Sequence, residues 1–361
     1  MGISELFRLM GAYPILPITI VLVFGILFVC GWTDGPNTVA TAVGTRCMRP
    51  RRAIIMCAIF NFLGLISMYF ISTATANSIM SIVDFGNNYV IALYTLSASM
   101  IAVILWGAFA TTFGIPSSQS HSLIAGIIGG GLAALTLGHN VHPDFSANGT
   151  FAWTLYGLVL SIIFGVIVGF LVNKLIVLIC KKLKNKFAKP FFKRAEIVSC
   201  AGLSFVHGAQ DGLKFLGVIF LCISLAGKAD GVICDFTSRG TLNSFWWIAL
   251  ICGLFLAGGT LVGSNKMIKK VGMSMVSLKQ YEAFTTDFTS TIGVLISTLF
   301  GIPISTSQVK TCSILGVGAS KNIKKVNWSS AKTMVINWIC TFPGCALVSY
   351  LLSMLLISVC I

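Results

Sequence analysis

Apolar runs separated by short polar breaks fill almost the whole chain. Most of these runs approach the roughly 20 residues that a helix needs to cross the hydrocarbon core of a bilayer. The run at 304–320 is shorter and rich in Ser and Thr, which predicts a re-entrant or broken helix. We therefore predict an all-α, multi-spanning membrane protein. Its segments, about ten in number, lie at roughly 14–45, 53–75, 90–112, 114–137, 151–178, 197–227, 243–264, 283–302, 304–320 and 333–360.

Composition supports this class of protein. Hydrophobic residues make up 56% of the 361 residues, charged residues only 10%, and the mean hydropathy is +0.92. This is more apolar surface than a soluble core could bury, and it leaves no room for a sizeable soluble domain. No basic region or cleavage site marks Pro14 to Cys30 as a signal peptide, so we expect a retained span. The 12 cysteines form no CxxC pair, which predicts neither a disulfide framework nor a zinc site.

The basic residues predict how the chain lies in the membrane. The formal net charge of +15 comes from short Lys and Arg clusters between apolar runs, a pattern typical of orientation signals rather than of nucleic-acid binding. The connections at 76–89 and 138–150 carry no Lys or Arg, and 228–242 is mixed. Basic and non-basic connections alternate along the chain if each segment crosses the membrane once and both termini lie outside the plasma (inner) membrane. The basic clusters, expected in the cytoplasm, lie at 46–52, 181–194, 266–279 and 321–325.

Two short patterns recur in the same order in the two halves of the chain. The stretch GWTDG at 31–35 is matched by GAQDG at 208–212, and GIPSSQS at 114–120 is matched by GIPISTS at 301–307. The predicted topology makes the two copies antiparallel, as in many secondary transporters. We expect one transmembrane domain with a first repeat at 1–178, a basic cytoplasmic linker at 179–196 and a second, inverted repeat at 197–361.

Two acidic residues fall inside apolar runs. Asp211 lies in the middle of one run and Asp287 near the start of another. A carboxylate at the bilayer centre costs roughly 2.5–3.5 kcal/mol, so it needs a partner or an aqueous cavity. Asp34 is expected at similar depth because it matches Asp211 in the repeat. The plainer alternative is that Asp211 only pairs with Lys214 or caps a helix.

A proline follows Asp34 almost at once and predicts a break in the helix. Pro36 removes a backbone hydrogen bond, and broken helices are tolerated at membrane depth only where they line a cavity. Freed carbonyls with Asp34 and Asn37 would form an oxygen-rich site for a coupling cation, sodium or a proton. Gln210 and Asp211 would supply the mirrored half, and sodium would bind Asp34, Asn37 and Asp211. No other cofactor is expected, and an ordinary proline kink is the alternative.

Hydroxyl residues follow both Gly-Ile-Pro stretches. Hydroxyls and the free amides of a new helix N-terminus bind an oxyanion without a cationic side chain. Because these hydroxyl stretches occur in both halves of the chain, we interpret them as an anion site rather than as helix-packing residues. His121 could carry a proton but is interpreted as a hydrogen-bonded structural residue, and Lys214 is expected to pair with Asp211 rather than to meet the anion. The residues of this expected site are Ser117, Ser118, Ser120, Ser305, Thr306 and Ser307, with Gln308 beside them.

The stretches that carry these residues resemble the signatures of the inorganic phosphate transporter family, the PiT-type permeases. They are 31–46, 114–126, 204–214 and 301–308. The resemblance implies cation-coupled phosphate uptake, with Asp34, Asn37 and Asp211 near the coupling ion and the hydroxyl pairs around the anion. The chain departs from the family pattern at Gln210, Leu213, Ser307, Gln308 and Asp287. Leu213 stands where the family has a polar residue, so a possible cation ligand is lost there. This loss bears on sodium coupling more than on anion transport.

The sequence thus predicts a transporter, not an enzyme, that imports phosphate with a cation by alternating access. A sulfate or other oxyanion permease is the alternative, although carboxylate acceptors favour phosphate because only phosphate donates O–H hydrogens near neutral pH. A channel would need a continuous polar lining, and an enzyme built on Ser118 and His121 would lack an orienting acid. The expected partners are the anion and membrane lipid, with no nucleic acid; a homodimer is left open.

Overall fold

The computed structural model describes residues 3–112, 118–143, 145–146, 149–181, 185–236, 238–263, 268 and 275–360. Helices make up nearly all of this part of the chain, which confirms the all-α prediction. The one pair of strands in it, β1 (Val83–Asp84) and β2 (His142–Pro143), is antiparallel and pairs Val83 with Pro143.

The helices differ widely in length. Six helical stretches of the described chain are long and apolar enough to cross a membrane, and α12 is a shorter apolar helix. The helices are α1 (Ile3–Ala12), α2 (Ile15–Thr33), α3 (Gly35–Thr38), α4 (Ala40–Gly44), α5 (Pro50–Ile71), α6 (Ala74–Met80), α7 (Tyr89–Thr112), α8 (Gln119–Thr136), α9 (Thr150–Cys180), α10 (Asn185–Ala229), α11 (Arg239–Ser244), α12 (Trp246–Val262), α14 (Gln280–Leu299), α15 (Thr306–Asn322), the 3₁₀ turn η1 (Ile323–Lys325) and α16 (Trp328–Cys360).

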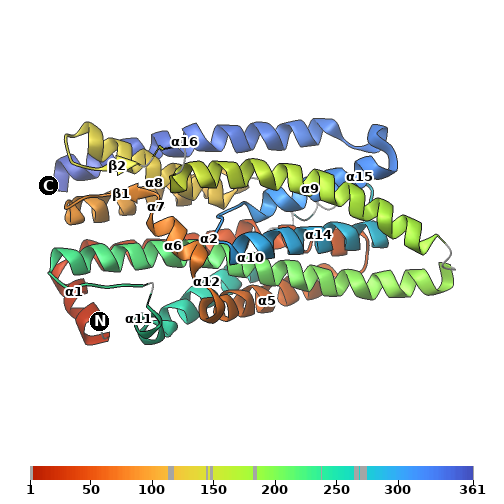
Figure 1. Ribbon diagram of the computed structural model, residues 1–361, viewed down its shortest axis with the longest axis horizontal. Coiled ribbons are helices and arrows are strands. Elements are labelled where there is room, and N and C mark those ends of the chain that lie inside the picture. The colour runs from red at the N-terminus through yellow and green to blue at the C-terminus, as the bar shows by residue number, and fades with distance from the viewer. Residues whose placement is uncertain are drawn as a thin grey trace.

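The long helices run roughly along one axis of the molecule (Figure 1). Both termini lie at one end, together with β1, β2 and α11. The end of α9, the start of α10 and the connection from α15 to α16 lie at the opposite end (Figure 1).

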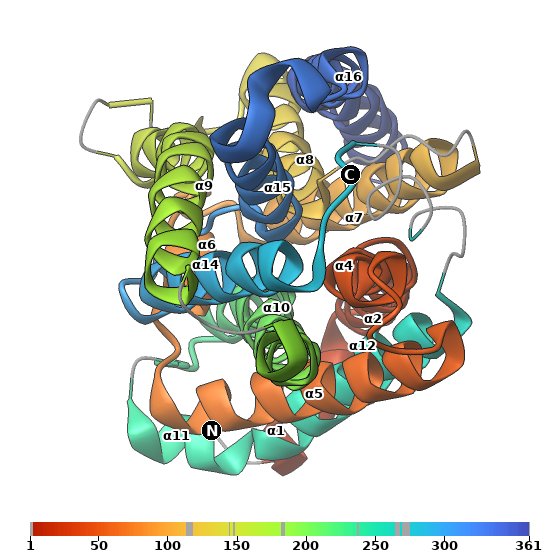
Figure 2. The same cartoon turned by 90° about the vertical axis from the view of Figure 1, so that its right-hand side faces the viewer.

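Helix α10 forms the centre of the bundle. It packs against α5, α14, α6, α2 and α7. In its most apolar 18-residue stretch, 89% of the residues are buried inside the bundle. The corresponding share is 17% for α9 and 22% for α16, which lie at the periphery (Figure 2). Large apolar side chains such as Leu178, which is 68% exposed, cover the outside of α9. An exposed apolar belt of this kind is what lipid requires.

Helices α8 and α15 begin in the interior of the bundle. Their N-cap residues, Ser118 and Ser305, are both buried, and from there the helices extend toward opposite ends of the molecule (Figure 1). A serine cap satisfies the first backbone amides and lets a helix start inside the bundle. The re-entrant or broken helix at 304–320 and the crossing at 114–137 both stay predictions.

The interruption of the first span at Pro36 is mild. Asp34 keeps a helical backbone (φ −96°, ψ −30°), and its amide still bonds to the Cys30 carbonyl. The Gly35 carbonyl accepts a hydrogen bond from the Thr38 hydroxyl at 2.8 Å. The chain is interrupted again at Val39 (φ −102°, ψ 0°), so α2, α3 and α4 are three separate helices. The role of this break in lining a cavity stays a prediction.

Candidate functional site

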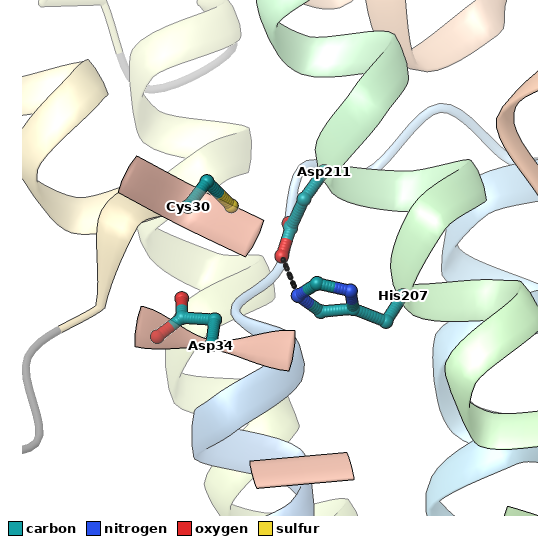
Figure 3. A group of neighbouring side chains, drawn as sticks. All are labelled: Cys30, Asp34, His207 and Asp211. Atoms are coloured by element: carbon teal, nitrogen blue, oxygen red, sulfur yellow. Dashed lines mark ion pairs between the residues drawn. The ribbon is translucent and has the colours of Figure 1, made fainter. Parts of the chain in front are cut away.

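Four buried side chains from two helices meet in the interior of the bundle. Cys30 and Asp34 lie one turn apart at the end of α2, and His207 and Asp211 lie one turn apart on α10 (Figure 3). One ligand atom from each lies within 4.8 Å of the others. This confirms the expectation that Asp34 and Asp211, which are far apart in the sequence, lie close together.

Asp211 connects α10 to the start of α15. Its Oδ1 lies 2.6 Å from the Lys214 ammonium, and its Oδ2 accepts a hydrogen bond from the Thr306 hydroxyl at 2.9 Å. The His207 ring approaches Oδ2 at 3.3 Å (Figure 3). The predicted pairing of Asp211 with Lys214 is confirmed, and it neutralises the buried carboxylate.

Lys214 also reaches both hydroxyl stretches. Its ammonium donates to the Ser120 hydroxyl at 2.6 Å and to the Ile304 carbonyl at 2.5 Å. The same three-donor group thus holds Asp211, the first turn of α8 and Ile304, which lies two residues before α15. Lys214 therefore pairs with the Asp211 carboxylate, as the sequence predicts, and also lies beside the hydroxyl groups at which the anion is expected.

Asp34, Asn37 and Ser307 present buried oxygen atoms beside one another. The Oδ1 atoms of Asp34 and Asn37 are buried and have no hydrogen-bond partner among the described residues, and the same holds for the Ser307 hydroxyl. All three side chains line one small interior cavity. Leaving a buried acceptor unsatisfied costs about 1–3 kcal/mol, and more for a charge. The residues present are therefore suited to a cation or a proton.

The N-termini of α8 and α15 face each other. The Ser118 hydroxyl donates to the Ser305 hydroxyl at 2.7 Å. Each serine also caps its own helix by accepting a backbone amide, from His121 at 3.3 Å and from Gln308 at 3.2 Å. The positive ends of two helix dipoles converge here. Ser117 lies outside the described residues.

Two glutamines that were predicted in or beside the site form hydrogen bonds elsewhere in the structure. The Gln210 amide donates to the Ile302 carbonyl at 2.9 Å, and its oxygen accepts from the Thr298 hydroxyl. Both ends of this carboxamide are therefore engaged away from the cation group, which corrects the predicted role of Gln210. The Gln308 side chain accepts from Ser161 on α9 at 3.1 Å.

His121 is buried in the interior of the bundle. Its ring packs on Phe342 with centroids 5.0 Å apart. Its role as a hydrogen-bonded structural residue stays a prediction.

Asp287 lies in a second buried group. Its carboxylate accepts from the Thr41 hydroxyl at 3.0 and 2.8 Å and contacts the Lys310 ammonium. The sequence prediction omitted Lys310 and gave no role to His207. A signal for Lys310 was present, because it is a charged residue within a run otherwise suited to the membrane interior, as Asp211 is.

An all-helical bundle with an apolar exterior, paired charges and facing helix N-termini in its interior defines a membrane protein of the transporter class. The sequence profile of the phosphate transporter family matches residues 30–349. The chain belongs to this family, and the resemblance seen in the sequence is confirmed.

Individual relatives match over nearly the full length. A Bacillus subtilis protein named "Probable low-affinity inorganic phosphate transporter" is 31% identical over 316 residues, covering 88% of this chain and 89% of its own. A Rhizobium meliloti protein of the same name is 30% identical and covers 94% and 96%. The solved structure of "The sodium-dependent phosphate transporter" has the same fold, with a TM-score of 0.81, 24% identity, and coverage of 96% of this chain and 100% of that one. The names are those of transporters, which supports a role other than catalysis.

Proposed function

We propose that this protein is a secondary active transporter that imports inorganic phosphate together with a cation. The observation that carries the proposal is that Asp34 and Asp211 lie in one buried group. Asp211 also accepts a hydrogen bond from the Thr306 hydroxyl at the start of α15. The relatives named above as phosphate transporters support phosphate as the anion.

The anion site is proposed at the facing N-termini of α8 and α15. Ser118, Ser120, Ser305, Thr306 and Ser307 would donate hydroxyl hydrogens to the anion, joined by Ser117 from the sequence pattern. The helix dipoles and Lys214 would balance its charge. A carboxylate acceptor next to these donors favours an anion that carries O–H hydrogens, which distinguishes phosphate from sulfate.

The cation site is proposed between the end of α2 and α10. Asp34, Asn37 and Asp211 offer oxygen atoms, and two of these oxygens have no partner in the described chain. Oxygen donors suit sodium, and a proton on Asp34 would serve the same electrostatic purpose. The sodium dependence in the name of the structural neighbour supports the first choice.

The architecture proposed for this mechanism is a pair of inverted repeats, 1–178 and 197–361, joined by the basic linker. Helices α7 and α8 would form one hairpin and α14 and α15 the other, with the helix starts meeting in mid-bilayer. Both termini would face the outside of the plasma membrane, and rocking of one half against the other would give alternating access.

Uptake by the purified protein in proteoliposomes tests the function. Labelled phosphate should accumulate against its own gradient when an inward sodium or proton gradient is imposed, each applied separately. Excess sulfate should compete weakly. Uptake that only equilibrates phosphate would indicate a channel, and strong competition by sulfate would indicate a general oxyanion permease; either result would overturn the proposal.

A further inference from the structure

A second buried ionic group lies next to the proposed transport site. Lys310 on α15 contacts a carboxylate oxygen of Asp287 on α14. Its ammonium also donates to the Thr41 hydroxyl at 2.7 Å and to the Thr38 carbonyl at 3.3 Å. The Lys310 side chain is 2% exposed and that of Asp287 is 0% exposed, so the pair is out of reach of bulk solvent.

The atoms around the ammonium are those of a cation site. A carboxylate, a hydroxyl and a backbone carbonyl, contributed by α14, α4 and α3, converge on one point. Such oxygen donors are the ligands of hard cations. Lysine is a compact single positive charge on a flexible stem, so it can take the place of a monovalent ion.

Glu196 supports this reading. It is fully buried on α10, and its Oε1 has no hydrogen-bond partner within the described chain. The charged groups that act on it most are Asp287 and Lys310. Glu196 thus places a second buried carboxyl group beside the Lys310–Asp287 pair.

The second group is continuous with the first. Lys310 lines the same small cavity as Asp34 and Asn37. Thr38, whose carbonyl accepts from Lys310, directly follows Asn37, and Lys310 lies one helical turn after Thr306. Charge in the second group is therefore felt at both the proposed cation site and the proposed anion site.

We propose that Asp287, Thr41 and the Thr38 carbonyl form a second cation site and that Lys310 is its resident, covalently tethered cation. A mobile ion is therefore not bound there during transport. The role of this site in transport rests on the proposed function. The existence of the site can be tested by measuring cation binding alone.

The experiment counts radioactive sodium bound to the purified full-length chain at mildly alkaline pH and saturating sodium. Lys310→Met removes the charge and nearly keeps the length of the side chain, so it should bind one more sodium ion per chain than the wild type. Lys310→Arg retains the positive charge and should show the wild-type number. Adding Asp287→Asn to Lys310→Met should abolish the gain.

An unchanged sodium count in Lys310→Met would overturn the inference, and so would a gain that survives the added Asp287→Asn. If Lys310→Met does not fold, Lys310→Gln provides the same comparison with a polar side chain. Binding is measured without phosphate transport, so failure of the wild type to accumulate phosphate would count against the proposed function and leave the sodium count to decide the site.

Discussion

The Ser118 hydroxyl donates a hydrogen bond to the Ser305 hydroxyl at 2.7 Å although 187 residues separate the two serines. Each serine is also the N-cap of its own helix, so this contact joins the starts of α8 and α15 in the interior of the bundle. Two positive helix ends are thereby held beside Lys214 and Asp211. The proposed anion site depends on this contact.

Loss of the Asp211 charge should abolish accumulation. In Asp211→Asn, Lys214 keeps its charge but loses the buried carboxylate at 2.6 Å, and breaking a buried pair in this way costs roughly 3–5 kcal/mol. We expect phosphate accumulation to fall by at least about tenfold, with the protein still present in the membrane. Asp230→Asn, which breaks the exposed pair with Arg8, is the matched control and should transport normally.

Removal of both capping serines should weaken binding of the anion more than binding of the cation. Ser118→Ala with Ser305→Ala deletes two hydroxyl donors, each worth roughly 1.5–3 kcal/mol toward a charged acceptor. The phosphate KM should therefore rise by about tenfold or more, while the half-saturating cation concentration stays unchanged. Ser358→Ala, an exposed serine bonded to its own helix, is the control. An unaltered phosphate KM in the double variant would place the anion elsewhere.

Gln210 and Asn37 should behave differently when each is changed to Ala. Gln210 holds the Ile302 carbonyl and the Thr298 hydroxyl, so Gln210→Ala should lower the free energy of unfolding by about 1–3 kcal/mol with an unchanged cation dependence. Asn37→Ala should leave stability nearly unchanged and raise the half-saturating cation concentration. Thermal unfolding and uptake at varied cation concentration measure the two effects. The reverse pattern would restore the role that the sequence alone suggested for Gln210.

Gly208 allows α5 and α10 to pack closely beside the site. A Cβ atom at this position would lie 2.0 Å from the Asn61 carbonyl oxygen. Gly208→Ala should therefore force the helices apart, cost about 1–3 kcal/mol or more and displace His207 and Asp211, so that Tm and uptake fall together. Gly240→Ala, with nothing within 4 Å of the added atom, should change neither quantity.

The sequence predicted the parts of this structure that simple physics constrains strongly. Apolar runs of spanning length indicated the helical membrane fold, and the cost of a buried charge indicated that Asp211 needs a partner, found in Lys214. The match between the two repeats correctly placed Asp34 near Asp211.

Other features depend on packing that a linear pattern does not contain. Gln210 precedes Asp211 directly, but successive helical residues point about 100° apart, so only Asp211 faces the group with Asp34. The start of α8 inside the bundle depends on the Ser118 cap and its contact with Ser305, which the apolar length of 114–137 does not reveal. Lys310 finds Asp287 only after α14 and α15 pack together.

The most direct test of one shared interior site is the phosphate Kd of the purified protein, measured by calorimetry with and without the coupling cation. Reciprocal linkage requires each ligand to change the affinity of the other by the same factor. We predict that the cation tightens phosphate binding in the wild type and that Asp34→Asn removes this effect. A phosphate Kd that does not respond to sodium or to pH would contradict the proposal.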